Sequence, residues 1–213
     1  MTRTVLCFGD SLTWGRKPDG SGRHDKKIRW PSVLADELGQ DVFVIEEGLN
    51  GRTTVFDDNT VEEDRNGARV LPTLLASHSP LDLIIIMLGT NDLKSYTGGS
   101  AFAARQGMAR LIQLIKHYPY GFGFQVPDIL IVAPPHIRET AHELYSSLFM
   151  SALTQSKQLS VYYSDLADQY DCQFFDASSI VKASVIDGVH LDEENTKNLG
   201  RALVSPIRMI LGL

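Results

Sequence analysis

An apolar segment near the start of the chain, residues 5–8, places the strongest constraint on the fold. Four consecutive apolar residues are typical of a short strand buried on both faces, as in a parallel sheet. The segment stops at Gly9, which permits a tight turn, and Asp10 and Ser11 follow it. Open α/β sheets build their sites at the carboxyl ends of such strands. Ser11 is therefore the first candidate for chemistry, with a plain Gly-Asp-Ser turn as the alternative.

Four more apolar segments alternate with helical patterns along the chain. Strands are expected over 41–46, 81–88, 129–133 and 172–175, with 81–88 in the centre. Helices are expected over 30–38, 69–77, 101–117, 143–170 (in two pieces) and from about 193 onward. This alternation predicts an α/β fold, a three-layer α/β/α sandwich around a five-stranded parallel sheet. Pro72 should leave only a short helix, and Pro206 should kink or break the last one.

Composition excludes several classes of protein. The formal net charge of −6 argues against nucleic acid as a partner, because phosphate binding needs a basic surface. No stretch approaches the roughly 20 apolar residues that span a bilayer, so no membrane association is expected. Cys7 and Cys172 lie in separate apolar segments and are expected to be buried free thiols. We therefore expect a cytoplasmic protein with a single domain over residues 1–213.

Small-residue turns carry the candidate site. Ser11, Gly51 and Asn91 each follow an apolar strand closely, so in a parallel sheet they should crowd one edge. Asp187 and His190 lie together in a later turn. Each turn alone could be purely structural, and only their combination points to chemistry.

This combination meets the needs of acyl transfer. A serine hydroxyl is a weak nucleophile, so Ser11 needs a base, and His190 can serve if Asp187 orients its ring. The tetrahedral oxyanion then needs donors, which the N–H groups of Ser11 and Gly51 and the amide of Asn91 would supply. The Gly-x-Ser-x-Gly elbow of the α/β-hydrolases is absent, because Thr13 stands at the second glycine position.

Neighbouring polar residues receive structural interpretations. Asp10 and Asp92 are expected to stabilise turns rather than to catalyse. His136 and His142 lack the ligand pattern of a metal site, so they are expected to be ordinary loop histidines. Three further residues could line the pocket, with simple packing or turn roles as the alternative: Trp14, Asn50 and Val189.

Three loops have roles that the sequence leaves open. The basic loop 16–29 is either a solvated surface loop or a rim over Ser11. The acidic run 57–64 is either solvated or faces that basic loop, within a subunit or across an interface. The aromatic loop 118–127 either plugs the domain or makes a subunit contact.

At this point the chain resembles the SGNH, or GDSL, hydrolase family. The matching motifs span nearly the whole chain in the family's order: Gly9-Asp10-Ser11-Leu12, Gly51, Gly89-Thr90-Asn91-Asp92 and Asp187-Gly188-Val189-His190. The stretches 6–15, 45–49 and 85–92 look most like the bacterial arylesterase and acyltransferase branch.

The resemblance implies a flavodoxin-like sheet, an acyl-serine intermediate and no metal or organic cofactor. It implies Ser11 as nucleophile, His190 as base, Asp187 as its orienting partner, and Gly51 with Asn91 as oxyanion donors. It also implies assembly into a homo-oligomer.

The leading hypothesis is therefore a serine esterase for small aryl or short-chain acyl esters, with possible transfer of the acyl group to alcohols. A carbohydrate O-deacetylase is the enzymatic alternative. A flavodoxin-like nucleotide-binding module is the non-enzymatic one, although no phosphate-cradle motif supports it.

Overall fold

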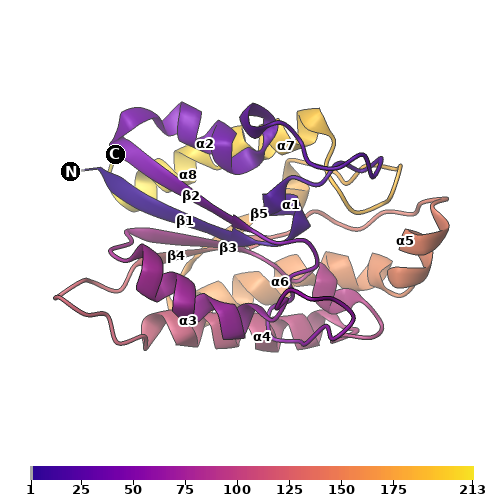
Figure 1. Cartoon of the computed structure of the whole chain (residues 1–213), viewed down its shortest axis with the longest axis horizontal. Coiled ribbons are helices and arrows are strands. Elements are labelled where there is room, and N and C mark those ends of the chain that lie inside the picture. Colours follow the sequence, from indigo (N-terminus) through magenta and orange to yellow (C-terminus); the bar gives the residue numbers. More distant parts are fainter. Residues whose placement is uncertain (1) are drawn as a thin grey trace.

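The computed structural model describes residues 2–213 and contains one sheet of five parallel strands, in the order β2-β1-β3-β4-β5 (Figure 1). This confirms the predicted three-layer α/β/α architecture. The strands are β1 (Arg3–Gly9), β2 (Val42–Gly48), β3 (Leu83–Met87), β4 (Asp128–Ala133) and β5 (Gln173–Asp176).

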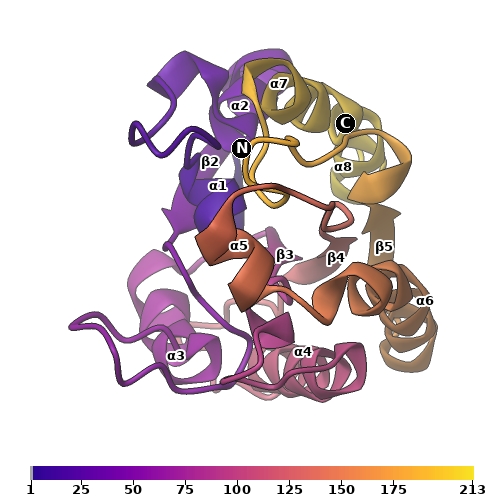
Figure 2. The same cartoon turned by 90° about the vertical axis from the view of Figure 1, so that its right-hand side faces the viewer.

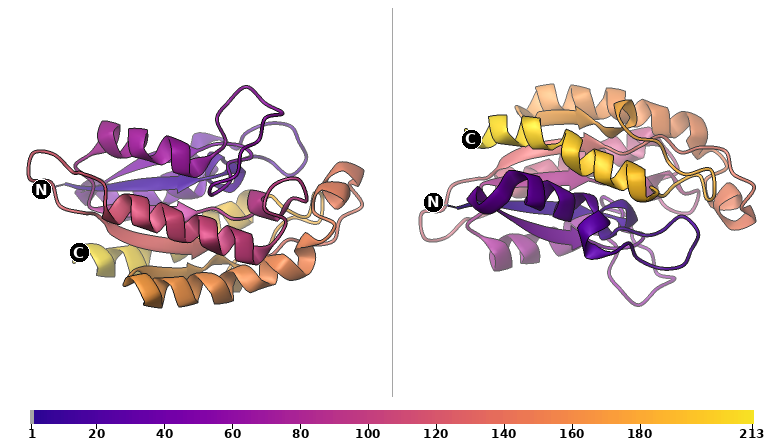
Figure 3. Two further views of the ribbon diagram at one scale, coloured as in Figure 1. Left: turned by 90° about the horizontal axis from the view of Figure 1, so that it is seen from below. Right: turned by 90° about the horizontal axis from the view of Figure 1, so that it is seen from above.

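Helices cover both faces of the sheet (Figures 1 and 3). One layer holds α2 (Trp30–Leu38), α7 (Glu193–Ala202) and α8 (Val204–Leu211). The other holds α3 (Gly67–His78), α4 (Ala101–Lys116) and α6 (Ala152–Tyr170). Two short helices lie beyond the strand ends, α1 (Ser11–Trp14) and α5 (Glu143–Leu148). Four 3-10 turns complete the described elements: η1 (Lys26–Ile28), η2 (Gly39–Asp41), η3 (Asn91–Leu93) and η4 (Ala177–Ser179).

The central strands explain why the apolar runs are continuous. Successive side chains of a strand point to opposite faces, so a strand between two helical layers needs apolar residues at every position. Leu6 and Phe8 of β1 pack into the core beneath α3, α4 and α6. Val5 and Cys7 pack into the core beneath α2, α7 and α8. All four are fully buried, which confirms the expected double-sided strand.

The prediction of a short helix around Pro72 was wrong. Helix α3 continues through Pro72 and spans 12 residues. Asn66 caps its first turn by accepting a hydrogen bond from the N–H of Arg69. Leu71 and Leu75 are fully buried against the sheet, and this packing outweighs the one backbone hydrogen bond that proline removes.

Three smaller expectations need adjustment. Cys172 precedes β5 instead of lying in it and is only half-buried, whereas Cys7 is fully buried; both are free thiols. The helical spacing of apolar residues over 101–117 predicts that Phe102 shares the buried face of α4, but its side chain is mostly exposed. The last helix does break, but at Leu203, which places Pro206 in the first turn of α8, where its missing N–H costs no hydrogen bond.

The two charged loops do not pair with one another within the chain. Asp57, Asp58, Glu63 and Asp64 of the acidic run form ion pairs with the arginines that directly follow it, Arg65 and Arg69. In the basic loop, Arg23 and Arg29 pair instead with Glu46 at the end of β2. The contact across an interface stays a prediction.

The aromatic loop 118–127 does not plug the domain, because Phe122 at its tip is 97% exposed. Its role in subunit contact, and the homo-oligomer itself, stay predictions. No helix within residues 2–213 has the length and hydrophobicity needed to cross a membrane.

Candidate active site

Figure 2 shows α1 and α5 at the end of the sheet where the strands terminate. The predicted site residues come together at this end, where Ser11 begins α1 and His190 contacts Tyr145 of α5. Ser11 follows β1, and Gly51 lies three residues past the end of β2. Asn91 begins the 3-10 turn after β3. The loop that precedes α7 brings Asp187 and His190 to the same place.

Ser11, His190 and Asp187 form one hydrogen-bonded chain. The Asp187 carboxylate accepts a hydrogen bond from Nδ1 of His190, with an Oδ2–Nδ1 distance of 2.6 Å. Because Nδ1 carries that proton, Nε2 is left as an acceptor, and the Ser11 hydroxyl donates to it at 2.9 Å. All three side chains are buried, at 6%, 3% and 1% exposure for Ser11, His190 and Asp187. The arrangement has the geometry of an activated serine.

The turn around Gly188 holds Asp187 against His190. The second carboxylate oxygen of Asp187 accepts the backbone N–H groups of Val189 and His190, both at 2.9 Å. Burial by itself would raise the pKa of Asp187, but its hydrogen bonds and the charge of His190 outweigh burial and hold that pKa below its usual range. Asp187 is therefore ionised at neutral pH and can support an imidazolium.

Two glycines let α1 sit directly on the strand ends. A Cβ on Gly9 would lie 2.0 Å from Oγ1 of Thr13, and a Cβ on Gly48 would lie 2.2 Å from the backbone nitrogen of Trp14. Asp10 caps α1 by accepting the N–H of Leu12 at 2.9 Å. Asp10 thus has the turn-stabilising contact expected of it, and the close packing fixes the position of the helix that begins with Ser11.

The residues that carry the three expected oxyanion donors line the same cavity. The backbone N–H groups of Ser11 and Gly51 make no hydrogen bond among residues 2–213, and Gly51 adopts a left-handed conformation (φ +79°) that suits glycine. The Nδ2 group of Asn91 lines the cavity and donates to Oδ2 of Asp10 at 3.2 Å and to the carbonyl of Arg52 at 3.1 Å. These contacts hold the amide in place and occupy both of its hydrogens, so Asn91 can donate to a ligand only by exchanging one of them.

Arg52 is a site residue that the sequence reasoning missed. Its buried guanidinium donates to the carbonyl of Gly9 at 2.9 Å and to that of Glu47, and it lies over the ring of Phe8. Burial lowers its pKa to about 10, so it stays charged at neutral pH. Arg52 ties the ends of β1 and β2 together and offers its own carbonyl to Asn91. Its position directly after Gly51 was the only available signal.

The carboxyl groups of Asp10 and Asp92 are completely buried next to the segments that carry the expected oxyanion donors. Burial raises the pKa of Asp10 to about 7 and that of Asp92 to about 6. Asp92 accepts the backbone N–H of Thr54 at 3.1 Å and also its hydroxyl. Asp92 thereby joins the segment after Gly51 to the turn that carries Asn91, which is the structural role expected of it.

A cavity of about 280 Å³ opens onto Ser11 and His190. Asn50 and Val189 line it as considered, whereas Trp14 does not and instead lies beneath the guanidinium of Arg23. The remaining lining residues come from several elements: Arg16, Gly51, Arg65, Asn91, Lys94, Tyr96, Leu144, Tyr145, Leu148 and Phe149. Of these, Leu144, Tyr145 and Leu148 form a wall supplied by α5. The sequence did not predict this wall, because helix α5 carries no motif that indicates a site.

Two other features lie apart from this chemistry. A larger hollow of about 840 Å³ beside His136 contains neither Ser11 nor His190, so volume alone does not identify the site. Within residues 2–213, no three His, Cys, Asp or Glu side chains gather as a metal-binding group, and neither His136 nor His142 has such neighbours.

Comparisons with known proteins show which family the chain resembles. A model of the GDSL-like lipase/acylhydrolase family matches residues 7–196. Among solved structures, the chain is similar to a carbohydrate acetylesterase family member from Sinorhizobium meliloti, at 52% identity, with all of both chains covered and a TM-score of 0.98. No match was found among curated proteins.

Two further structures are 40% identical to the chain, which each comparison covers to 98%, with all of the other chain covered. One is an aryl esterase from M. smegmatis, with a TM-score of 0.92. The other is Est24, a carbohydrate acetylesterase from Sinorhizobium meliloti, with a TM-score of 0.93.

Proposed function

We propose an acyl-serine mechanism for this chain, which belongs to the GDSL-like lipase/acylhydrolase family and is a carboxylic ester hydrolase. The observation that carries the proposal is the continuous contact from Asp187 through His190 to the Ser11 hydroxyl. In this proposal Ser11 is the nucleophile, His190 the base and Asp187 its orienting partner.

The first half of the reaction forms the acyl-enzyme. Oγ of Ser11 attacks the ester carbonyl carbon while its proton moves to Nε2 of His190. The negative charge that develops on the carbonyl oxygen is stabilised by the N–H groups of Ser11 and Gly51. Nδ2 of Asn91 becomes the third donor when it exchanges one of its two protein acceptors for this oxygen. The C–O bond to the alcohol then breaks, and His190 returns its proton to the departing oxygen.

The second half releases the acyl group. Water takes the place of the alcohol, His190 removes its proton, and the attack frees the carboxylic acid and restores the Ser11 hydroxyl. An alcohol that entered instead of water would form a new ester, so acyl transfer needs no additional catalytic group. The small volume of the cavity, about 280 Å³, supports an acyl group of only a few carbons.

A carbohydrate O-deacetylase is the second candidate function. It is favoured by the similarity to two proteins described as carbohydrate acetylesterases, one of which is 52% identical to the chain. A comparison of kcat/KM for an acetylated xylan fragment and for phenyl acetate separates the two. A higher value for the sugar would put deacetylation first.

Serine labelling tests the mechanism itself. Brief treatment with a sulfonyl fluoride should add one adduct, mapped to Ser11 by peptide mass. Ser11→Ala should abolish both labelling and ester hydrolysis, and His190→Ala should greatly slow both. Ser21→Ala, an exposed serine in the basic loop, is the matched control and should behave as the unaltered protein. Full hydrolysis by folded Ser11→Ala would overturn the proposal.

A further inference from the structure

The cavity beside Ser11 is strongly cationic in a chain whose formal net charge is −6. Its described lining includes the side chains of Arg16, Arg65 and Lys94, and no aspartate or glutamate. An ester without charge requires no such surroundings. Cationic walls of this kind concentrate anionic ligands and bind them once inside.

Of the three residues, Lys94 gives the strongest evidence for an anionic ligand. It is 7% exposed and lies just after the 3-10 turn that Asn91 begins. Among residues 2–213 its ammonium group forms no hydrogen bond or ion pair; it lies 5.8 Å from the ring centres of both Tyr96 and Phe149. Burying a cation without a partner is costly, so such a group is expected to meet an anion that the chain itself does not supply.

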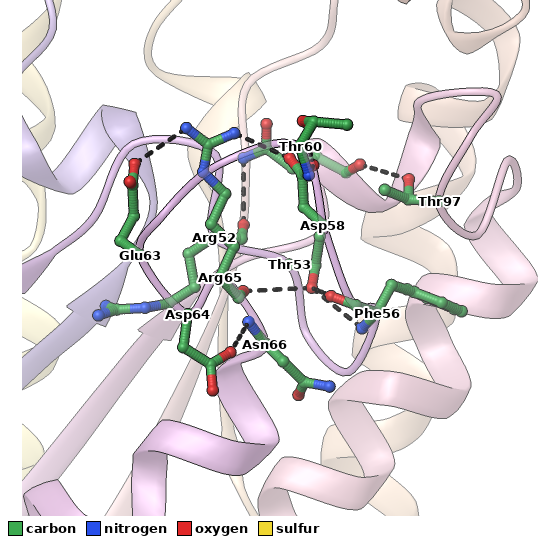
Figure 4. A network of polar contacts seen from close by, with 11 residues as sticks. Arg52, Thr53, Phe56, Asp58, Thr60, Glu63, Asp64, Arg65, Asn66 and Thr97 are labelled. Carbon is green, nitrogen blue, oxygen red and sulfur yellow. Dashed lines mark hydrogen bonds and ion pairs between the residues drawn. The ribbon is translucent and has the colours of Figure 1, made fainter.

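The carboxylates around Lys94 are already engaged. Asp58 accepts from Arg65 at 2.8 Å and from the hydroxyl of Thr60 at 2.5 Å, and Arg65 also reaches Glu63 (Figure 4). Asp10 and Asp92 bind the donors described above. Their charges and that of Asp58 act on Lys94 from a distance, but none of these carboxylates forms an ion pair with its ammonium group.

Arg16 adds a second free cation. Its backbone N–H donates to the carbonyl of Ser11 at 3.0 Å, so it lies one helical turn beyond the nucleophile. Its Nε atom is buried without a hydrogen-bond partner, and its guanidinium forms no ion pair among residues 2–213. Arg16 and Lys94 thus present two unpaired cationic groups to one cavity.

We propose that the preferred substrate of this esterase carries a carboxylate close to its ester bond, and that Lys94, with Arg16, binds this carboxylate. The proposal rests on the esterase function proposed above for the same site. The carboxylate can belong to the acyl group, as in a hemiester of a dicarboxylic acid. It can equally belong to the alcohol, as in an O-acetylated hydroxy acid or uronic acid.

Matched pairs of esters test the proposal and distinguish the two sources. On the alcohol side, 3-acetoxybenzoate is compared with 3-acetoxybenzamide; on the acyl side, phenyl hydrogen glutarate is compared with its terminal amide. Each pair differs only in charge at one position. We expect the anionic member of one pair to have at least a tenfold higher kcat/KM, and the pair that responds identifies the source of the carboxylate.

Four variants test whether the preference depends on Lys94. Lys94→Met should bring the ratio of anionic to neutral kcat/KM close to one, and Lys94→Arg should keep most of it. Lys27→Met, an exposed lysine in the basic loop, makes the same chemical change outside the cavity and should leave the ratio unaltered. Arg16→Met should lower the ratio in part and serves if Lys94→Met does not fold.

The outcomes separate this proposal from the one it rests on. If the neutral esters are hydrolysed and Ser11 is labelled, but the unaltered protein has no preference for either anionic ester, only the carboxylate proposal fails. It also fails if the preference survives in folded Lys94→Met. If no ester is hydrolysed and Ser11 is not labelled, the esterase mechanism itself fails.

Discussion

The ring of Tyr145 stands edge-on to the imidazole of His190, with centroids 5.6 Å apart and an angle of 88° between the planes. Tyr145 comes from α5, which crosses the carboxyl ends of the strands (Figure 2). Phe149 stacks against the tyrosine at 6.5 Å, and His142 contacts it edge-on at 5.0 Å. His190, the proposed base, thus lies beneath an aromatic cover supplied by a helix outside the sheet.

Removing this cover should weaken catalysis more than folding. Tyr145→Ala deletes an aromatic pair of the kind worth about 0.5–1.5 kcal/mol and opens the cavity to water. We expect kcat/KM for phenyl acetate to fall roughly three- to tenfold, on the same energy scale. Met150→Ala removes a mostly exposed side chain that does not line the Ser11 cavity and should leave this constant unaltered. Equal effects of the two substitutions would contradict a role for the cover.

Asp187→Asn tests the orientation of the base. An asparagine can still accept the backbone N–H groups of Val189 and His190, so the turn should fold. Its amide nitrogen cannot accept from Nδ1 of His190, so the ring takes the tautomer that cannot receive the Ser11 proton. Losses of about 10⁴-fold in kcat are typical of this change in serine hydrolases. Steady-state kinetics with phenyl acetate measure the loss, and circular dichroism checks the fold. A loss below tenfold would argue that Asp187 does not orient the base.

The buried carboxyl of Asp10 makes stability depend on pH. Its pKa in the folded protein is raised to about 7 from an ordinary value near 3.8, so the folded state binds more protons than the unfolded state between these values. The contribution of Asp10 to the free energy of unfolding is therefore most favourable below about pH 4 and is lost as the pH rises toward 7.

Asp10→Asn should remove this dependence. Urea unfolding at pH 5 and pH 8 measures the free energy of unfolding of both proteins. We expect the unaltered protein to lose more stability than Asp10→Asn between the two values, with Asp19→Asn as an exposed control that behaves like the unaltered protein. Parallel pH dependence in all three proteins would show that Asp10 titrates normally.

Helix α4 packs closely against Thr54 because Gly107 has no side chain. A Cβ there would lie 1.8 Å from Oγ1 of Thr54, the residue whose hydroxyl and N–H bind Asp92. Alanine normally stabilises a helix interior by about 1 kcal/mol relative to glycine, but overpacking costs about 1–3 kcal/mol. We expect Gly107→Ala to lower the melting temperature. Gly121→Ala, where a Cβ would meet nothing within 4 Å, should change it little. A higher melting temperature for Gly107→Ala would contradict the packing argument.

Local patterns were sufficient to predict the sheet and the core of the site. Each strand is a compact apolar run, and the residues after each strand must meet at one edge of a parallel sheet. Ser11, Gly51 and Asn91 could therefore be expected at one edge from the topology alone. Asp187 and His190 lie in a turn that follows no strand directly, so their place at the same edge was predicted from the chemistry that Ser11 needs.

The rest of the site depends on contacts between distant segments. The aromatic wall from α5 and the unpaired state of Lys94 follow from how loops pack over the strand ends, and no sequence period encodes that. The charged loops show the same limit. The acidic run could have paired with the basic loop 16–29, but its carboxylates pair with Arg65 and Arg69 instead. Helix α3 gives a further example. Proline disfavours a helix interior, but the burial of Leu71 and Leu75 keeps the helix continuous through Pro72.

The contact between Ser11 and His190 joins residues 179 positions apart, so the order of synthesis matters. A ribosome makes the serine, Gly51 and Asn91 long before it makes the turn that carries Asp187 and His190. A nascent chain that ends before this turn has a hydroxyl but no group to take its proton. Under the proposed mechanism, the chain therefore gains hydrolytic activity only after the turn that carries Asp187 and His190 has been synthesised and has packed against the strand ends.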